Sequence, residues 1–270
     1  MKANFYFFLL LVLLANSCVE PVITIPEFTL PTSDRVVLVE ELTGVQCPNC
    51  PAGAAAVENM LKNFEGKVVA VAVHGRFLSA PLPQSKYDFR NKAAEDLENW
   101  HRPFIGKPCA LINRAKFNGE DYVTVDNIGV WQSYATQELQ KPHVLDVFLD
   151  YSYDPATRRL ELEVLMNPLV DQSSEAKISV FITESGMVDY QKNQNVIIPD
   201  YVHNHVLRDM MTAFDGDALA TLTKGQTQRK NYTYTIPQDW VFENLEIVVA
   251  VGRNTPNDRT ILQAAAVKTK

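Results

Sequence analysis

The sequence has few cysteines, no excess of basic residues and no apolar run long enough to span a membrane. Its formal net charge is −7, and because nucleic-acid phosphates are bound by basic surfaces, we expect no nucleic-acid partner. Internal repeats and low-complexity tracts are absent. The sequence contains no serine-hydrolase signature, phosphate-binding loop or HExxH zinc motif, and we expect no cofactor.

The first 17 residues combine one cation, Lys2, with an apolar run from residue 5 to residue 15. A charged start followed by a short apolar stretch and small residues is typical of a secretory signal peptide. A membrane-spanning helix needs about 20 apolar residues, so this run is too short to be one. We expect residues 1–17 to be a signal peptide.

The segment LANSC, which ends at Cys18, resembles a bacterial lipobox, in which the cysteine becomes the acylated first residue. Ala15 and Asn16 depart from the usual pattern, and the alternative is an ordinary signal peptide with an incidental thiol at Cys18. Residues 18–34 hold three prolines and no helical period, which predicts an extended, semi-rigid tether. We expect membrane lipid on Cys18. Val19, in place of the aspartate that retains some lipoproteins in the inner membrane, favours the outer membrane, on either face.

The cysteines predict one disulfide. Lipidation of Cys18 leaves Cys47, Cys50 and Cys109, and an odd number in an oxidising compartment implies one pair and one remaining thiol. Only two residues separate Cys47 from Cys50, so we predict that these two are paired.

Residues 35–142 alternate strand and helix patterns. Residues 36–41 and 67–73 are β-branched and apolar, and a helix that begins at Pro51 lies between them, so we expect a parallel β-α-β unit. The patterns that follow predict a helix near residues 86–98, strands at 109–114 and 122–125, and a helix over 127–140 capped by Asp126.

The order β-α-β-α-β-β-α, the CxxC at the start of the first helix and Pro108 at the start of the third strand resemble the thioredoxin fold. The resemblance implies that the Lys107–Pro108 bond is cis and that Pro108 faces the CxxC. It also implies that Glu41 is a buried proton acceptor for the resolving thiol. The alternative is that Glu40 or Glu41 is simply a solvated carboxylate.

Cys47 and Cys50 suit a thiol–disulfide oxidoreductase, because a helix N-terminus stabilises a thiolate. The spacing gives Cys47 the exposed position of a nucleophile and places Cys50 one turn in, as the resolving thiol. The substrates would be thiols or disulfides of envelope proteins. The alternative is a non-catalytic surface binding or assembly module, in which the CPNC is a structural disulfide. Gln46 stands where thioredoxins have tryptophan, so the redox potential is not indicated.

Two further sets of residues have alternative interpretations. Cys109 is either a buried core residue or a third thiol that exchanges with Cys47. His203 and His205 lie two apart on an expected strand and would face the same way. Two histidines without a further ligand are weak evidence for a metal site, and we expect no metal.

After residue 142 the pattern changes to strands separated by turns, at residues 143–153, 159–166, 176–184, 205–211, 228–236, 245–251 and 261–267. This spacing predicts an antiparallel immunoglobulin-like β-sandwich over residues 143–270. The expected fold class is therefore α/β plus all-β, with a thioredoxin-like domain over 35–142 followed by the sandwich.

The lipobox, the thioredoxin-like segment opening on VEELTGVQCPNCP and the sandwich containing YVHNHVLRD are together similar to one family. This is the twenty-eight-kilodalton outer-membrane protein family of Bacteroidetes lipoproteins. The resemblance covers nearly all of the chain after the leader. It implies a location and an architecture more than an activity.

If Cys18 carries the lipid, Cys18→Ala should move the protein from the membrane fraction to the soluble fraction. Fractionation and mass spectrometry of the N-terminal peptide measure this. Unchanged partitioning, with no lipid mass on that peptide, would contradict acylation.

Overall fold

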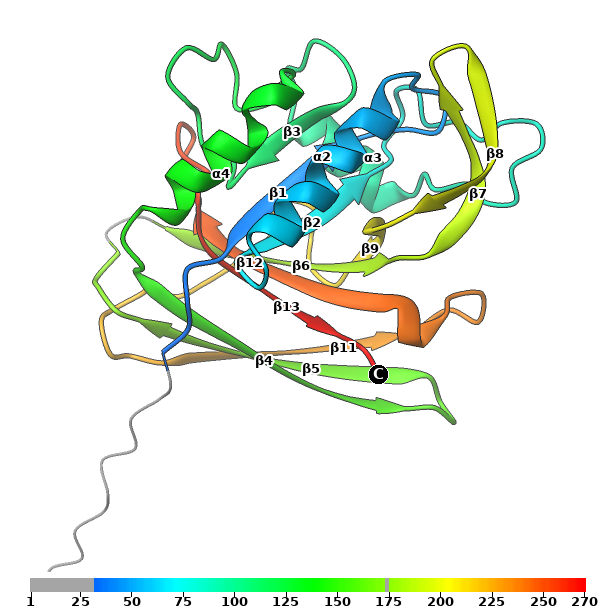
Figure 1. Ribbon diagram of the computed structural model, residues 1–270. Helices are drawn as coiled ribbons and strands as arrows, with labels where there is room; N and C mark the ends of the chain where they lie inside the picture. Colours follow the sequence, from blue (N-terminus) through cyan, green and yellow to red (C-terminus); the bar gives the residue numbers. More distant parts are fainter. Residues whose placement is uncertain (1–31, 173–174) are drawn as a thin grey trace, which may run out of the picture. The chain divides into compact units, whose positions relative to one another are not determined.

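The computed structural model describes residues 32–172 and 175–270 (Figure 1). The expected signal peptide, Cys18 and nearly all of the expected tether lie outside the described residues. Ser33–Lys270 form one compact unit. Within the described part of the chain, no helix is both long enough and apolar enough to cross a membrane.

Apart from the expected strand at residues 122–125, the first part of this unit has the element order that the resemblance to thioredoxins implies. Strands β1 (Val37–Leu42) and β2 (Val68–Val73) are parallel and buried throughout. Helix α2 (Cys50–Asn63) connects them and packs Val57 and Met60 onto their apolar side chains. Strand β3 is antiparallel to β1. The remaining bounds are β3 (Cys109–Ile112), α3 (Lys92–Trp100), the 3-10 helix η2 (Ile128–Val130) and α4 (Trp131–Leu139).

Helix α3 begins later than the sequence suggests. The Asn91 side chain accepts a hydrogen bond from Ala94 N (2.8 Å) and caps the helix, so its first residue is Lys92. Residues 86–87 instead donate their backbone N–H groups to the carboxylate of Asp189, at 2.9–3.1 Å. Hydrogen bonds to a residue about 100 positions further along the chain therefore replace the expected first turns of this helix.

Two other expectations near the end of this part are wrong. The expected strand at residues 122–125 is reduced to a single antiparallel bridge between Ala110 and Val125. The last helical segment is capped by Asn127, whose side chain accepts a hydrogen bond from Gly129 N (3.0 Å), and not by Asp126. The sequence pattern placed the cap one residue too early.

From β4 onward the chain consists mainly of antiparallel strands. Strands β4, β5 and β11 form a three-stranded sheet, and β6, β9, β12 and β13 lie in a larger one. Alternate residues of β5 are buried, as the period of two predicts, and they face β6 and β12 across a common apolar core. The bounds are β4 (Leu145–Asp154), β5 (Arg159–Pro168), β6 (Ala176–Glu184), β9 (Val206–Met210), β10 (Asp217–Ala218), β11 (Gln228–Thr235), η3 (Phe242–Asn244), β12 (Leu245–Arg253) and β13 (Ile261–Lys268).

One sheet runs through both parts, in the order β13-β12-β6-β9-β2-β1-β3 (Figure 1). The parts join where β9 lies parallel to β2, with Val206 opposite Ala72. One apolar core then combines Val71 of β2 with Phe181 of β6 and Val248 of β12. The expected boundary between residues 142 and 143 stays a prediction.

A second hairpin, β7 (Met187–Asn193) and β8 (Val196–His203), is missing from the sequence-based expectation. Its burial pattern in β7 alternates, but the buried positions include the polar side chains of Asp189 and Gln191, so an apolar pattern is lacking. Gln194 turns the chain between the two strands with a φ of 51°. This hairpin determines the surroundings of the CPNC segment.

Because Phe181 is completely buried in the core shared by both parts, Phe181→Ala should lower the free energy of unfolding by about 3–5 kcal/mol. Urea unfolding, followed by tryptophan fluorescence and by far-ultraviolet circular dichroism, should give one coincident transition. Phe77→Ala is the control, because that side chain is 44% exposed. Two separated transitions in the unsubstituted protein would contradict a common core.

Candidate functional site

The two cysteines of the CPNC segment lie at the start of α2. Backbone hydrogen bonds from Cys47 N to Gly44 O (3.1 Å) and from Cys50 N to Cys47 O (3.4 Å) close the turn before the helix. Cys50 is the first residue of α2 and Pro51 the second, where a missing N–H removes no helical hydrogen bond. The sulfur atoms are 2.15 Å apart in a disulfide, so the predicted pairing is confirmed.

Both cysteines are buried, with exposed fractions of 0% for Cys47 and 2% for Cys50, so the expectation of an exposed Cys47 is wrong. The β7–β8 hairpin covers the loop and donates hydrogen bonds to its carbonyl groups. These bonds are Lys192 N to Val45 O (2.9 Å), Gln194 N to Pro48 O (2.8 Å) and Gln191 Nε2 to Cys47 O (3.2 Å). A protein thiol cannot reach either sulfur atom while the hairpin is in place.

Pro108 lies against the first turns of α2, and the Lys107–Pro108 bond is cis, as the resemblance to thioredoxins implied. A Cβ atom on Gly53 would lie 2.7 Å from Pro108 Cβ and 2.7 Å from Glu41 Oε1. Only glycine allows so close an approach. Helix α2, Pro108 and Glu41 therefore meet immediately after the disulfide.

A buried ion pair that the sequence analysis missed holds the loop beside Pro108. Lys107 Nζ lies 2.5 Å from Glu98 Oε2, and both side chains are fully buried. Lys107 also donates to the carbonyl oxygens of Thr43 (2.8 Å) and Phe77 (2.7 Å). Burial lowers the pKa of Lys107, although Glu98 acts in the opposite direction. No local sequence pattern marks this pair, because its members come from separate elements.

Glu40 is part of a buried charged cluster. Arg114 contacts it at 2.7 Å through two nitrogen atoms, and His101 Nε2 lies 3.3 Å away. Burial raises the pKa of Glu40, but Arg114 and His101 outweigh burial and hold that pKa far below its usual range. Glu40 is therefore a buried, ionised structural residue, and the solvated alternative is wrong for it.

Glu41 points to the other side of β1, toward α2. Burial raises its pKa to about 8, against a hydrogen bond from Thr43 and the positive charges of His205 and Lys107. Its Oε1 atom has no hydrogen-bond partner among the described residues. The carboxyl group is therefore largely protonated near neutral pH and is not a solvated carboxylate.

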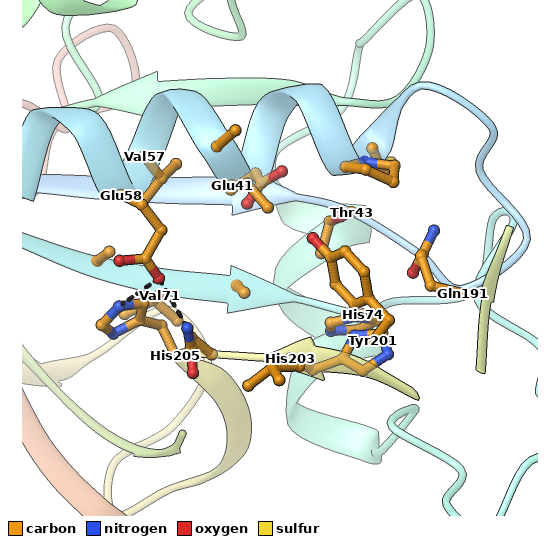
Figure 2. A pocket seen from close by; sticks show the side chains of 18 residues that line it. Glu41, Thr43, Val57, Glu58, Val71, His74, Gln191, Tyr201, His203 and His205 are labelled. Atoms are coloured by element: carbon orange, nitrogen blue, oxygen red, sulfur yellow. Dashed lines mark hydrogen bonds and ion pairs between the residues drawn. The ribbon is translucent and has the colours of Figure 1, made fainter. Parts of the chain in front are cut away.

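A cavity of about 350 Å³ lies between α2, β2 and β8, with Cys50 in its wall (Figure 2). This volume is within the usual range of small-molecule sites. The apolar lining comes from Pro51, Ala54, Ala55, Val57, Ala70, Val71, Ala72 and Val202. The polar lining comes from Glu41, Thr43, Glu58, His74, Gln191, Tyr201, His203, Asn204 and His205.

Three of the five histidines line this cavity, in different charge states. Burial lowers the pKa of His74, and burial lowers that of His203 to about 4, so both rings are neutral near pH 7. His205 lies 3.5 Å from Glu58 and 3.8 Å from Glu246. These two carboxylates outweigh burial and raise the pKa of His205 to about 9.

His203 and His205 do not face the same way along one strand, which corrects the sequence-based expectation. His203 ends β8, whereas His205 has a left-handed φ of 54° between β8 and β9. The His203 ring packs against Phe89, with centroids 4.6 Å apart, and His205 faces Glu58 (Figure 2). In the described part of the chain, no three histidine, cysteine or acidic side chains are grouped to hold a metal ion.

Cys109 is the free thiol among the described cysteines, and it is completely buried in the core at the start of β3. Burial raises the pKa of this thiol, which removes the thiolate that disulfide exchange requires. The core-residue interpretation therefore agrees with its surroundings.

The elements described above define a class of protein: a thioredoxin-type β-α-β unit with a CxxC disulfide and a cis-proline, joined through one sheet to antiparallel strands. The family model described as "Outer membrane protein Omp28" matches residues 98–270. The chain belongs to this outer membrane protein family, and its location is the outer membrane. A comparison with curated proteins found no match.

Solved structures of similar fold include HBP35 of Porphyromonas gingivalis, with a TM-score of 0.69 and 12% identity over 88% of this chain and 77% of that one. A structural-genomics protein from Agrobacterium tumefaciens has a TM-score of 0.55 and 13% identity over 87% and 95%. A domain of the outer membrane lipoprotein Omp28 from Porphyromonas gingivalis is 19% identical over 48% and 91%, with a TM-score of 0.34. The first two likenesses extend across both parts of the chain.

Because the pKa of Glu41 is raised to about 8, the folded chain holds a proton that the unfolded chain releases above its ordinary pKa near 4.5. The unsubstituted protein should therefore lose stability relative to Glu41→Gln as the pH rises from about 5 to about 8. The relative loss should exceed about 1.4 kcal/mol, the equivalent of one pKa unit. Urea unfolding at several pH values measures this, and a constant difference would contradict the raised pKa.

Proposed function

We propose that this outer-membrane protein is a non-catalytic binding module, in which the Cys47–Cys50 disulfide is structural and forms part of a cavity wall. The single observation that carries the proposal is the burial of both cysteines beneath the β7–β8 hairpin. Disulfide exchange requires a thiolate to attack one of the two sulfur atoms, and neither is accessible. The buried Cys50 is also part of the wall of a cavity of a size that suits a small molecule.

The hydrogen bonds between hairpin and loop make the covered state the stable one. The two N–H groups of Gln191 Nε2 are shared among three carbonyl oxygens: Gly44 O (3.3 Å) and Cys47 O (3.2 Å) in the loop and Lys192 O (2.8 Å) in the hairpin itself. All of these atoms are buried or half-buried. Opening the hairpin would break the Gln191 bonds to Gly44 and Cys47, together with the two backbone bonds from Lys192 N and Gln194 N. Such a cover suits a disulfide that is retained rather than turned over.

A thiol–disulfide oxidoreductase is the second candidate, and the position of Glu41 favours it. Glu41 lies next to Pro108 and the start of α2, and its ionised form, which its pKa of about 8 makes the major form only above about pH 8, is suited to take a proton from a resolving thiol. In this candidate function the hairpin opens and an envelope thiol reductant first converts the Cys47–Cys50 disulfide to the dithiol. The Cys47 thiolate then attacks an envelope-protein disulfide and releases one substrate thiol, and Cys50 attacks the mixed disulfide, releases the second substrate thiol and re-forms the Cys47–Cys50 bond.

The proposal includes two finer points. Acylation of Cys18 would tether the module to the outer membrane, as the lipobox-like segment suggests. The antiparallel part would be an immunoglobulin-like sandwich, with β4, β5 and β11 facing β6, β12 and β13; the common apolar core supports this. A solved structure showing a different strand connectivity would contradict the second point.

The proposal is tested by the rate at which dithiothreitol reduces the folded protein, followed by alkylation and mass spectrometry of Cys47 and Cys50. We expect the disulfide of the folded chain to resist reduction under conditions that reduce the urea-unfolded chain. Gln191→Ala should accelerate reduction roughly fivefold or more, since it removes at least one net hydrogen bond of about 1 kcal/mol.

Lys192→Ala is the matched control, because its side chain is exposed and its backbone N–H still bonds to Val45 O. It should leave the reduction rate unchanged. Two results together would contradict the structural role of the disulfide and favour the oxidoreductase. These are fast reduction of the unsubstituted folded protein, and mixed disulfides trapped in cells by Cys50→Ala and not by Cys47→Ala.

A further inference from the structure

A second pocket, of about 380 Å³, lies where the end of β3 meets the loop between β12 and β13. Ile261 N donates to Asn113 O (2.8 Å) and holds these two segments together. The pocket shares no lining residue with the cavity beside the disulfide. A ligand bound here would therefore be independent of the function proposed above.

Arg114 is held rigidly in the wall of this pocket. Its side chain is 5% exposed, and Nε and Nη2 donate to the two carboxylate oxygens of Glu40, both at 2.7 Å. Nη1 has no hydrogen-bond partner among the described residues, and it is not one of their enclosed unpartnered atoms, so it reaches accessible space. Arg114 therefore presents N–H donors to the pocket from a fixed position.

The backbone that carries Arg114 is strained. Asn113 and Arg114 both have a left-handed φ of 50°, which residues other than glycine rarely adopt. The Asn113 side chain fixes this turn by accepting a hydrogen bond from Leu38 N (2.9 Å). Such strained positions are concentrated at ligand-binding and active sites, where the surrounding structure maintains them.

Arg259 is a half-buried cation on the other side of the pocket, with no carboxylate partner among the described residues. Its Nη1 atom donates to Trp100 O (3.2 Å). Burial lowers the pKa of Arg259, and the charge of Arg114 lowers it further. An anion between the two arginines would remove this repulsion.

The two guanidinium groups are close enough to share one ligand group. Their central carbons lie 4.9 Å (Arg114) and 4.4 Å (Arg259) from the centroid of the same Trp100 ring, so the carbons are no further apart than these two distances together. A phosphate group with one N–H···O hydrogen bond on each side spans about 8 Å between the donor nitrogens. Both arginines line the one pocket, so a phosphate there can contact both.

Positive charge exceeds negative charge around this pocket. The exposed Lys116 lines it as a third cation, and Asp258 is a lining carboxylate. Asp258 is already bonded to Arg253 (3.3 Å) and to a backbone N–H (2.9 Å), and burial lowers the pKa of His101, which leaves that ring neutral near pH 7. The charged groups of the pocket and their ion partners are four cations and two carboxylates: Arg114, Lys116, Arg253 and Arg259 against Glu40 and Asp258.

We propose that this pocket binds a phosphate monoester, whose oxygen atoms accept hydrogen bonds from Arg114, Lys116 and Arg259. Such an ester carries a charge of about −1.5 to −2 near pH 7 and three acceptor oxygens, which matches the excess of two positive charges. Hydrogen bonds between arginine and phosphate are charge-assisted and strong.

The rest of the lining suits the organic part of the ester. Leu111, Val123 and Pro256 add an apolar wall, and the volume lies within the usual range of small-molecule sites. The ester is either a soluble compound or the head group of a membrane lipid.

Isothermal titration calorimetry of the folded full chain with phenyl phosphate and benzenesulfonate tests the head group. These probes share one ring and a tetrahedral oxyanion, and at about pH 8 they carry about two negative charges and one, respectively. We expect phenyl phosphate to bind at least about tenfold more tightly than benzenesulfonate. Equal affinities, or no binding of phenyl phosphate at about 1 mM, would overturn the proposal.

Substitutions locate the site. Arg259→Gln should weaken phenyl phosphate binding about tenfold or more, and Lys116→Gln about threefold, because its side chain is exposed and screened. Lys116→Gln also leaves the buried contacts of the fold unchanged. Arg229→Gln is the matched control, since it removes one positive charge from β11, outside the pocket. Full affinity in both pocket variants, or equal weakening by Arg229→Gln, would overturn the assignment.

The source of the phosphate is distinguished by glycerol 3-phosphate and dihexanoyl phosphatidic acid, a water-soluble lipid with the same phosphate monoester. Each is titrated against the chain loaded with phenyl phosphate. Displacement by the lipid at a concentration about tenfold lower or less would assign a lipid head group, and equal or weaker displacement by the lipid would assign a soluble ester. Failure of both to displace phenyl phosphate at about 1 mM would overturn the phosphate site.

Discussion

The structure depends on the point where β9 joins the edge of β2. Val206 lies opposite Ala72, and Ala72 N donates to His205 O at 2.7 Å. This parallel contact continues one sheet from the β-α-β unit into the antiparallel strands and brings β8 beside α2 (Figure 1). The contact between β2 and β9 therefore positions both the hairpin that covers the disulfide and the cavity between α2, β2 and β8.

The two adjacent acids of β1 show that this arrangement places a structural charge on one face of the strand and a reactive carboxyl group on the other. Side chains alternate along a strand, so Glu40 and Glu41 point to opposite faces. Glu40 has Arg114 within 2.7 Å and is held ionised, whereas Glu41 faces α2 and the cavity without a cation in direct contact. The same residue type is therefore a structural ion on one face and a titratable group on the other.

Helix starts, strand bounds and the disulfide could be predicted from the sequence where residues close together in the chain determine them. The start of α2 at the CPNC, the disulfide within that segment and the bounds of β6 agree with prediction because turn residues and alternation specify them. The β7–β8 hairpin could not be predicted, since its buried side chains include the polar Asp189 and Gln191. Those side chains are buried because they bond to backbone atoms of residues 86–87 and of Cys47, which are distant in sequence.

The residues that carry the chemistry can be identified from the sequence: a cysteine pair at a helix start, a proline before β3 and an acid on β1. The surroundings of these residues, in contrast, are set by the packing of distant segments. Whether a thiol is accessible, or a carboxyl group is protonated, depends on what the hairpin, α2 and β2 remove from water. Burial is the sum of contacts among segments far apart in the chain, and no local pattern records it.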